Sequence, residues 1–293
     1  MSSLSFADNY LIVSEINHRF HNSLAKQIET GLSQANHSSH TITTNELKAR
    51  AYSDYDSIIT IGYTAASLLF QSNTSKPVLS LLIPLQAFTH LENSIDKQYR
   101  HLFSSIYIDQ PVARQLELIR QLSDTFHTVG IIFGKNSHQR KENISDTVKK
   151  FSLTPKTITV FDRTELISET RYLSEESDIL LAIPDNSIYN KRSIKGILLT
   201  TYRKKIPVLG YSKAYVRAGA LAAVFSSVTD ISRQTVETLI QNKSSGYLLT
   251  SRSYPKYFDI EINKKVAHSL NIKLRDKDII LKNMLRNAQN EQL

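Results

Sequence analysis

Two short apolar runs in the middle of the chain, Ile179–Ile183 and Ile206–Leu209, each end in polar residues that could bind a small molecule. Apolar runs of this length between helical segments are typical of strands buried on both faces of a parallel sheet. In open parallel sheets, ligands bind just beyond the carboxyl ends of the strands. The residues that follow the runs offer a carboxylate, an amide, a phenol and a hydroxyl, and they are Asp185, Asn186, Tyr211 and Ser212. This combination predicts capture of a small polar molecule.

The carboxylate of Asp185 has two possible roles. At a strand end it can accept a charge-assisted hydrogen bond from a ligand ammonium group, and such bonds are among the strong ones. It can also start a turn or cap the next helix, because Pro184-Asp185-Asn186 is common turn chemistry. The sequence leaves both roles open.

The segment Gly62–Ala66 follows the expected strand Ile58–Ile61 and opens a helix. Gly62 permits a tight turn, and Thr64 is expected to be the N-cap of that helix. Unpaired backbone N–H groups at a helix start attract an anion such as an amino-acid carboxylate. The alternative is that Thr64 caps its own helix and binds nothing. A nucleophile elbow is less in keeping with the segment, because its last small residue is Ala66 and Asp and His partners are missing from their characteristic positions.

A helix start in one part of the molecule and a carboxylate in another would match the two ends of a zwitterion, so an amino acid or a similar ligand is expected. Tyr211 and Tyr215 could pack against an apolar or aromatic part of it, although Tyr215 could equally belong to the core. Loops after other expected strands complete the predicted ligand site, with Glu15, Asn17, Tyr63, Ala65, Pro84 and Asn136. Asn17 has an alternative role as the N-cap of the first helix.

Strand and helix patterns alternate along the chain in two successive blocks. The expected fold is α/β, with two Rossmann-like lobes, each a parallel sheet flanked by helices, and a ligand cleft between them. Lobe 1 is expected over residues 8–110, completed by about 228–248, and lobe 2 over residues 111–227, completed by part of 249–293. The crossings are expected near Asp109–Pro111 and Ser226–Asp230. Residues 38–40 and 244–246 are expected to be loops.

Composition narrows the function classes. The 293 residues lack cysteine, which excludes disulfides, thiolate metal sites and a cysteine nucleophile. The nine histidines are scattered and do not form a metal set, and nucleotide-binding glycine motifs are missing, so neither a metal nor a cofactor is expected. The net charge of +9 comes from dispersed Lys and Arg without a recognition motif, so nucleic acid is not an expected partner.

The amino-terminal segment has two interpretations. Residues 1–7 lack the basic start and long apolar core of a signal peptide, but Ser5 and Ala7 before Asp8 resemble the tail of one. In the first interpretation an export signal is removed or truncated, and the protein is periplasmic or otherwise extracytoplasmic. In the second the protein stays in the cytoplasm.

The order of motifs in this chain resembles that of ABC-transporter substrate-binding proteins of the tryptophan/tyrosine-binding type. The resemblance rests on Pro184-Asp185-Asn186, Ile206–Ser212, Val216–Ala222, Ile61–Ala66, the segment Gln110–Phe133 and the closing helix from Ile262 to Leu270. It implies the type I periplasmic binding fold, and a loop at Gly62–Ala66 that holds the ligand carboxylate. It also implies a monomer without enzymatic activity that works with an ABC permease. The loops at Tyr63 and Leu82–Leu85 differ in size from the family's, which leaves ligands other than aromatic amino acids open.

Two rival functions come from other classes. A cytoplasmic or membrane-coupled ligand sensor would use the same fold to report a solute rather than deliver it. An α/β enzyme acting on a small molecule would need a catalytic dyad at the strand ends. The expected function is solute binding for an ABC importer.

Overall fold

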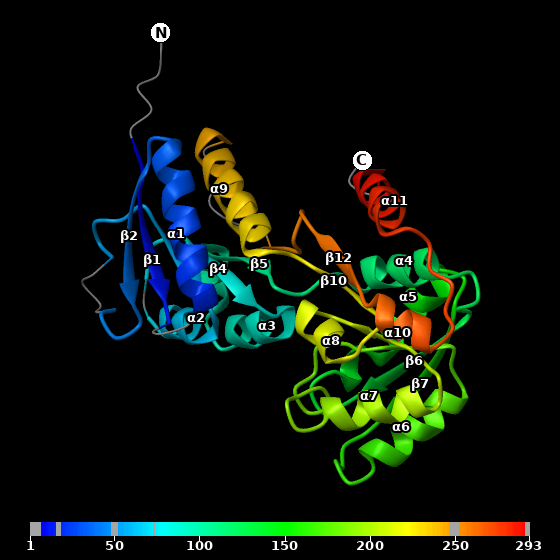
Figure 1. Cartoon of the computed structure of the whole chain (residues 1–293). Coiled ribbons are helices and arrows are strands. Elements are labelled where there is room, and N and C mark those ends of the chain that lie inside the picture. Colours follow the sequence, from blue (N-terminus) through cyan, green and yellow to red (C-terminus); the bar gives the residue numbers. More distant parts are fainter. Residues whose placement is uncertain (1–6, 16–18, 48–51, 73, 246–251, 291–293) are drawn as a thin grey trace. The chain divides into compact units, whose positions relative to one another are not determined.

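The computed structural model describes residues 7–15, 19–47, 52–72, 74–245 and 252–290. The chain forms two compact units, which Figure 1 shows in the colours of the sequence. Unit 1 comprises Met1–Asp109 and Ser226–Phe258, and unit 2 comprises Gln110–Phe225 and Asp259–Leu293. The chain therefore crosses between the units three times.

Unit 1 is a parallel sheet with helices on both faces. Its strand order is β11-β5-β4-β3-β1-β2, and every neighbouring pair is parallel. The strands are β1 (Asn9–Ser14), β2 (Ser38–Thr43), β3 (Ser57–Ile61), β4 (Val78–Ile83), β5 (Phe103–Tyr107) and β11 (Arg252–Ser253). The helices are α1 (Arg19–Gln34), α2 (Tyr63–Phe70), α3 (Leu85–Asn93), the short 3₁₀ helix η1 (Lys97–Leu102) and α9 (Val228–Ser245).

Both faces of this sheet carry a buried apolar core. Ile12 on β1 packs with residues of α1 and α9, while Leu11 and Val13 on the same strand pack with residues of α2 and α3. Successive side chains of a strand point to opposite faces, so a strand covered on both sides is largely apolar. This is why the mostly apolar run Ile58–Ile61 predicted the buried strand β3 correctly. The polar residues inside these strands are paired, as Thr60 on β3 donates to Ser80 on β4 at 3.1 Å.

The expectation of a loop at residues 38–40 was wrong, because these residues begin β2. β2 lies at the sheet edge and pairs only with β1, in parallel, and most of its side chains are at least partly exposed. An edge strand needs no continuous apolar run, and its polar residues therefore resemble a loop. The expected loop at 244–246 was also wrong at its start, since α9 continues to Ser245.

Unit 2 repeats the architecture with one antiparallel strand. Its order is β12-β10-β9-β8-β6-β7, and only the β10–β12 pair is antiparallel. The strands are β6 (Thr128–Phe133), β7 (Thr154–Thr159), β8 (Ile179–Leu181), β9 (Val208–Gly210), β10 (Ala222–Phe225) and β12 (Asp259–Ile262). The helices are η2 (His138–Arg140), α4 (Val112–Leu122), α5 (Lys141–Lys150), α6 (Leu166–Glu175), α7 (Ile194–Arg203), α8 (Lys213–Ala218), α10 (Lys264–Ser269) and α11 (Lys277–Asn290). Within the described part of the chain, the helices are all too short or too polar to span a membrane.

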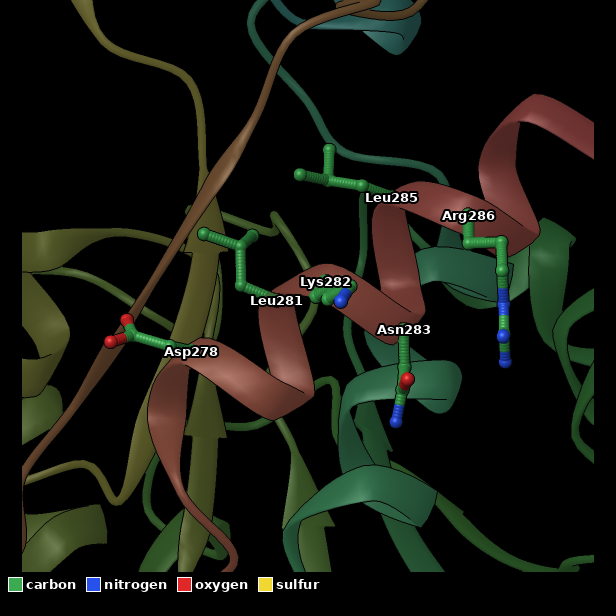
Figure 2. Close-up of a pocket in the computed structure, with 6 residues that line it drawn as sticks. All are labelled: Asp278, Leu281, Lys282, Asn283, Leu285 and Arg286. Carbon is green, nitrogen blue, oxygen red and sulfur yellow. The ribbon is translucent and has the colours of Figure 1, made fainter.

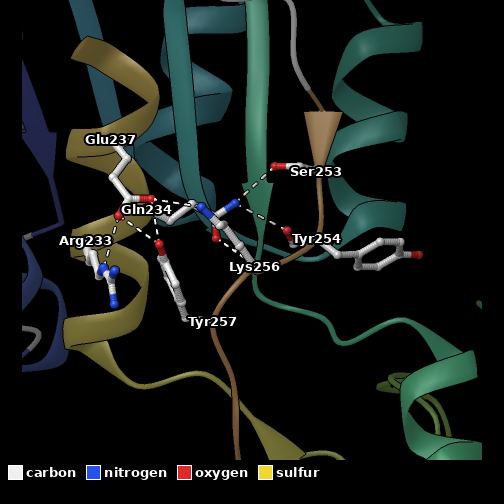
Figure 3. Close-up of polar contacts among 7 residues, drawn as sticks. All are labelled: Arg233, Gln234, Glu237, Ser253, Tyr254, Lys256 and Tyr257. Atoms are coloured by element: carbon white, nitrogen blue, oxygen red, sulfur yellow. Dashed lines mark hydrogen bonds and ion pairs between the residues drawn. The ribbon is translucent and has the colours of Figure 1, made fainter. Parts of the chain in front are cut away.

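Within unit 1, a polar network fixes the segment that precedes the third crossing to α9 (Figure 3). The amide of Gln234 donates to Ser253 and to the carbonyl of Tyr254, and its carbonyl accepts the N–H of Lys256 at 2.7 Å. The Glu237 carboxylate accepts the Tyr257 hydroxyl at 2.8 Å and also pairs with Arg233 and Lys256. The hydroxyl of Ser226 donates to the carbonyl of Tyr257 at 2.5 Å. This bond joins the segment just after the second crossing to the segment just before the third crossing.

The Glu237 network gives a prediction about acid stability. Partial burial acts to raise the pKa of Glu237, but the Tyr257 hydroxyl, Arg233 and Lys256 outweigh burial and hold the pKa below its ordinary 4.5. Ionised Glu237 therefore stabilises the fold above about pH 4.5, and this contribution is lost as the pH falls through the lower, folded-state pKa. The stability of Glu237→Gln should consequently fall less than that of the parent between neutral pH and pH 3, measured by urea unfolding. The exposed Glu142→Gln on α5 is the control; if both variants follow the parent, the network does not contribute to acid stability.

Candidate functional site

In unit 1, polar and turn residues follow the carboxyl ends of four strands. Glu15 follows β1, Gly62 follows β3 and Pro84 follows β4, while β5 is followed by the segment that leads to Asp109. Gly62 is the N-cap of α2 with φ 92° and ψ 166°, a conformation that glycine alone adopts readily. The expectation that Thr64 is the N-cap was therefore wrong. Thr64 lies one residue inside the helix start at Tyr63, and its own side chain is exposed.

The anion position at the start of α2 is occupied by the protein's own carboxylate. Glu15 Oε1 accepts the backbone N–H of Thr64 at 3.0 Å. The other carboxylate oxygen lies 3.9 Å from Nδ1 of the buried His21. Since the start of a helix favours negative charge, Glu15 satisfies this end of α2 without a ligand.

The next helix in unit 1 is capped in the same way. Asp109 Oδ2 accepts the N–H of Leu85 at 2.7 Å, immediately after Pro84, the N-cap of α3. Two adjacent helix starts at this edge of the sheet therefore each hold a carboxylate. The edge is acidic, and it suits a cationic or hydroxyl group of a ligand better than a carboxylate.

The remaining residues predicted in unit 1 differ in accessibility. Tyr63 is 46% exposed and Thr64 is exposed, so both side chains can meet a ligand. Pro84 is half-buried. Ala65 is fully buried, which leaves only its backbone for a ligand contact. Asn17 lies outside the described residues.

In unit 2, the Asp185 carboxylate organises two loops at the strand ends. The residue is only 3% exposed. Its Oδ2 accepts the Ser137 hydroxyl at 2.6 Å, and its Oδ1 accepts the Ser187 hydroxyl at 2.5 Å and the Ser187 N–H at 2.8 Å. The Asn136 amide donates to Oδ1 at 3.3 Å. A carboxylate has about four acceptor positions, so the geometry favours the turn role among the two that the sequence left open.

The same two serines also accept hydrogen bonds from the backbone of the loop after β6. The Ser137 hydroxyl accepts the N–H of Gly134 at 3.0 Å, and the Ser187 hydroxyl accepts the N–H of Lys135 at 3.0 Å. The loop after β6 and the loop after β8 thus form one unit around Asp185, and Asn136 and Asn186 are exposed on it. Both asparagine side chains carry donors that can reach a ligand at this edge.

Beyond β8 and β9, three tyrosines form a cluster. The hydroxyls of Tyr211 and Tyr215 lie 2.6 Å apart, and their ring centroids are 4.4 Å apart. The ring of Tyr189 contacts both edge-on, at centroid distances of 6.4 and 6.5 Å. Burial, and then the nearby Tyr215 and Asp185, raise the pKa of the Tyr189 hydroxyl, so it is neutral under ordinary conditions. Tyr211 is half-buried, and so is Ser212, which follows it directly in the chain.

Sequence reasoning missed two aromatic residues at this edge. Tyr189 lies in the polar loop after Asp185 and shows its core role only through its packing. Phe161 is 67% exposed, two residues beyond β7, and its ring meets His138 edge-on at 5.4 Å. β7 ends at Thr159, and the available signal for Phe161 was a large aromatic residue that is followed directly by Asp162.

A hollow lies along α11 (Figure 2) and has a volume of about 500 Å³. The described residues that line it belong to that helix, and they are Asp278, Leu281, Lys282, Asn283, Leu285 and Arg286. Asn283 points away from the leucines and donates to Gln121 of α4 at 3.3 Å. This hollow is remote in sequence from the strand ends. Among the described residues, no three His, Asp or Glu side chains are placed to hold a metal.

Comparisons with known proteins agree with this architecture. A family model described as ABC transporter substrate binding protein matches residues 20–284. No curated protein matches the chain closely enough to count as a relative. A ligand-free, open substrate-binding protein with adhesive properties from Clostridium difficile matches with a TM-score of 0.72 and 16% identity, covering 93% of this chain and 97% of that one.

Two further solved structures are similar. An ABC domain in complex with L-Trp from Streptococcus pneumonia has a TM-score of 0.61 and 20% identity, covering 93% of this chain and 98% of that one. A periplasmic ribose ABC transporter protein from Conexibacter woesei has a TM-score of 0.56 and 11% identity, with coverage of 94% and 97%. At these identities the likeness shows the fold alone, which is the type I periplasmic binding fold.

Proposed function

The chain belongs to the ABC transporter substrate-binding protein family, and from this premise we propose that it captures an amino acid or a related zwitterion for an ABC importer. Proteins of this family bind a small molecule and work with a transporter, and they are not enzymes. The family is typically extracytoplasmic. The proposal therefore includes a periplasmic or otherwise extracytoplasmic location, a membrane permease as partner and a monomeric state.

One observation supports the choice of a zwitterion. The residues at the strand ends of unit 1 differ in charge from those at the strand ends of unit 2. The edge of unit 1 presents the carboxylates of Glu15 and Asp109. The edge of unit 2 presents the exposed amides of Asn136 and Asn186, and the half-buried Tyr211 and Ser212 follow the neighbouring strand β9. Lys135 is exposed in the same loop, and within the described structure no ion pair engages it. A ligand with one cationic and one anionic end matches this contrast.

The polarity that we propose is the reverse of the one expected from the sequence. A ligand carboxylate at the start of α2 would be repelled by Glu15, whereas an ammonium group would be attracted to it. Asp185 already accepts four hydrogen bonds from its own loops, so the ammonium group gains little from it. We therefore assign the ligand ammonium to Glu15 and the ligand carboxylate to the donors of Lys135, Asn136 and Asn186.

The two ends of the ligand can be tested separately. Native mass spectrometry of freshly purified protein would first identify any co-purified molecule, and calorimetry would then compare the twenty amino acids. For the tightest amino acid, the des-amino analogue and the carboxamide analogue should each bind at least about tenfold more weakly, because each removes one charge-assisted contact.

Variants then assign each end. Glu15→Gln should reduce the preference for the amino acid over its des-amino analogue, and it should leave the preference over the carboxamide unchanged. Lys135→Ala should do the opposite. A neutral sugar that binds more tightly than every amino acid would contradict the zwitterion. If Glu15→Gln loses its preference over the des-amino analogue and its preference over the carboxamide to the same extent, the assigned polarity is wrong. The zwitterion itself would still stand in that case.

A further inference from the structure

The segment from Lys191 to Lys205 is strongly basic. It contains no Asp or Glu and six cationic residues, Lys191, Arg192, Lys195, Arg203, Lys204 and Lys205. All six are exposed. Lys204 pairs with Glu175 of α6 at 2.6 Å, while the described residues form no ion pair with the other five. Most of this charge is thus open to solvent, at the two ends of α7.

The outer face of α7 combines this charge with exposed apolar side chains. Leu199 and Tyr202 are 46% and 47% exposed. Lys195, Leu199 and Tyr202 are spaced by four and three residues, which places them on one stripe of the helix. Ile197, Leu198 and Thr201 form the opposite, buried stripe against unit 2. Leu199 and Tyr202 are therefore not needed for the core.

The neighbouring helix α6 adds an apolar side chain to this face. α6 and α7 lie side by side (Figure 1), and a Cβ atom at Gly196 would lie 2.9 Å from Cδ1 of Ile167, which is partly exposed. Two acidic residues at the end of α6 are paired with lysines. Glu175 pairs with Lys204, Glu176 pairs with Lys156 at 3.1 Å, and Glu169 is half-buried on α6.

We propose that this α7 face, defined by residues 191–205 with Ile167, binds the surface of an anionic phospholipid membrane. Cations stand at both ends of the helix with Leu199 and Tyr202 between them. This arrangement is typical of helices that lie in the plane of a membrane interface. Leucine and tyrosine enter the headgroup boundary, while long Lys and Arg side chains keep their charges at the phosphates. An acidic protein would also attract the cations, but cations at both ends of one exposed helix, with apolar side chains between them, fit an extended anionic surface better.

The proposal is tested on the full chain with vesicles. Vesicles of phosphatidylcholine and phosphatidylglycerol in a three-to-one ratio should bind the protein at low ionic strength, and pure phosphatidylcholine vesicles should not. Binding should weaken as salt is added, because it depends on screened charges. Lys195→Glu together with Arg203→Glu should weaken it at least about tenfold, since each cation near an anionic surface contributes roughly fivefold.

Two further variants make the outcome decisive. Lys150→Glu with Lys265→Glu changes the net charge equally at exposed positions of unit 2 outside α7, and it should bind nearly as well as the parent. Leu199→Ser with Tyr202→Ser keeps the charge and should weaken binding several-fold. Equal losses in the two charge variants would mean that net charge alone acts, and would overturn the proposal. Absence of binding to anionic vesicles would also overturn the proposal. If the protein then bound polyglutamate, and the Lys195→Glu, Arg203→Glu variant did not, the partner of this face would be an acidic protein.

Discussion

Replacement of Asp185 by alanine is expected to lower the free energy of unfolding by about 3 kcal/mol. The substitution removes a buried carboxylate that accepts four hydrogen bonds from Ser137, Ser187 and Asn136. Hydrogen bonds to charged groups are stronger than neutral ones, and the donors left behind in a buried site lose their partners. The two loops that Asp185 holds together should loosen, so ligand affinity should fall as well.

Urea unfolding measures the effect, and Asn186→Ala is the matched control. Asn186 is the next residue, is exposed, and contributes only its backbone carbonyl to the hydrogen bonds described. The control should change the free energy of unfolding by less than about 0.5 kcal/mol, as exposed positions usually do. Asp185→Asn should lie between the two variants, because the amide keeps one acceptor oxygen. If Asp185→Ala unfolds at the parent's urea concentration, the carboxylate does not organise these loops.

Replacement of Gly62 by alanine is expected to cost about 3 kcal/mol of stability, combining backbone strain and a steric clash. The residue has φ 92° and ψ 166°, which side chains rarely allow. A Cβ atom there would lie 2.6 Å from Cε1 of His21 and 2.9 Å from Oε1 of Glu15. Glu15 would have to move, and its hydrogen bond to the N–H of Thr64 would be lost. The variant should therefore also alter the binding of the ligand's ammonium end.

Gly196→Ala is the matched control for this prediction. Gly196 lies inside α7, where alanine is favoured over glycine by about 1 kcal/mol. Its new Cβ atom would meet only the end of the flexible Ile167 side chain, at 2.9 Å. Thermal unfolding should show Gly196→Ala unchanged or slightly stabilised and Gly62→Ala clearly destabilised. Similar melting temperatures for both variants would show that the turn at Gly62 tolerates a side chain.

Much of the fold could be predicted from the sequence, because the signals are local. The residues of β1, β3 and β4 are mostly apolar since both faces of their sheet are covered, and this pattern is visible in any short stretch of sequence. The restart of the alternation after Asp109 indicated a second block. The sheet edge was harder, because β2 is polar and pairs on one side only.

The sequence also predicted that the candidate site residues lie at the strand ends. It could not predict what each of these residues does there. Glu15 and Thr64 are 49 residues apart in sequence, and Ser137 and Asp185 are 48 apart. Neither pairing leaves a trace in the local pattern, so Thr64 was expected to be a cap and the role of Asp185 stayed open between ligand binding and a turn. Only the tertiary structure decided that Glu15 fills the start of α2 and that Ser137, Ser187 and Asn136 donate to Asp185. Periodicity and turn chemistry depend on neighbours in the chain, whereas the partner of a polar group depends on which strand ends the sheet brings together.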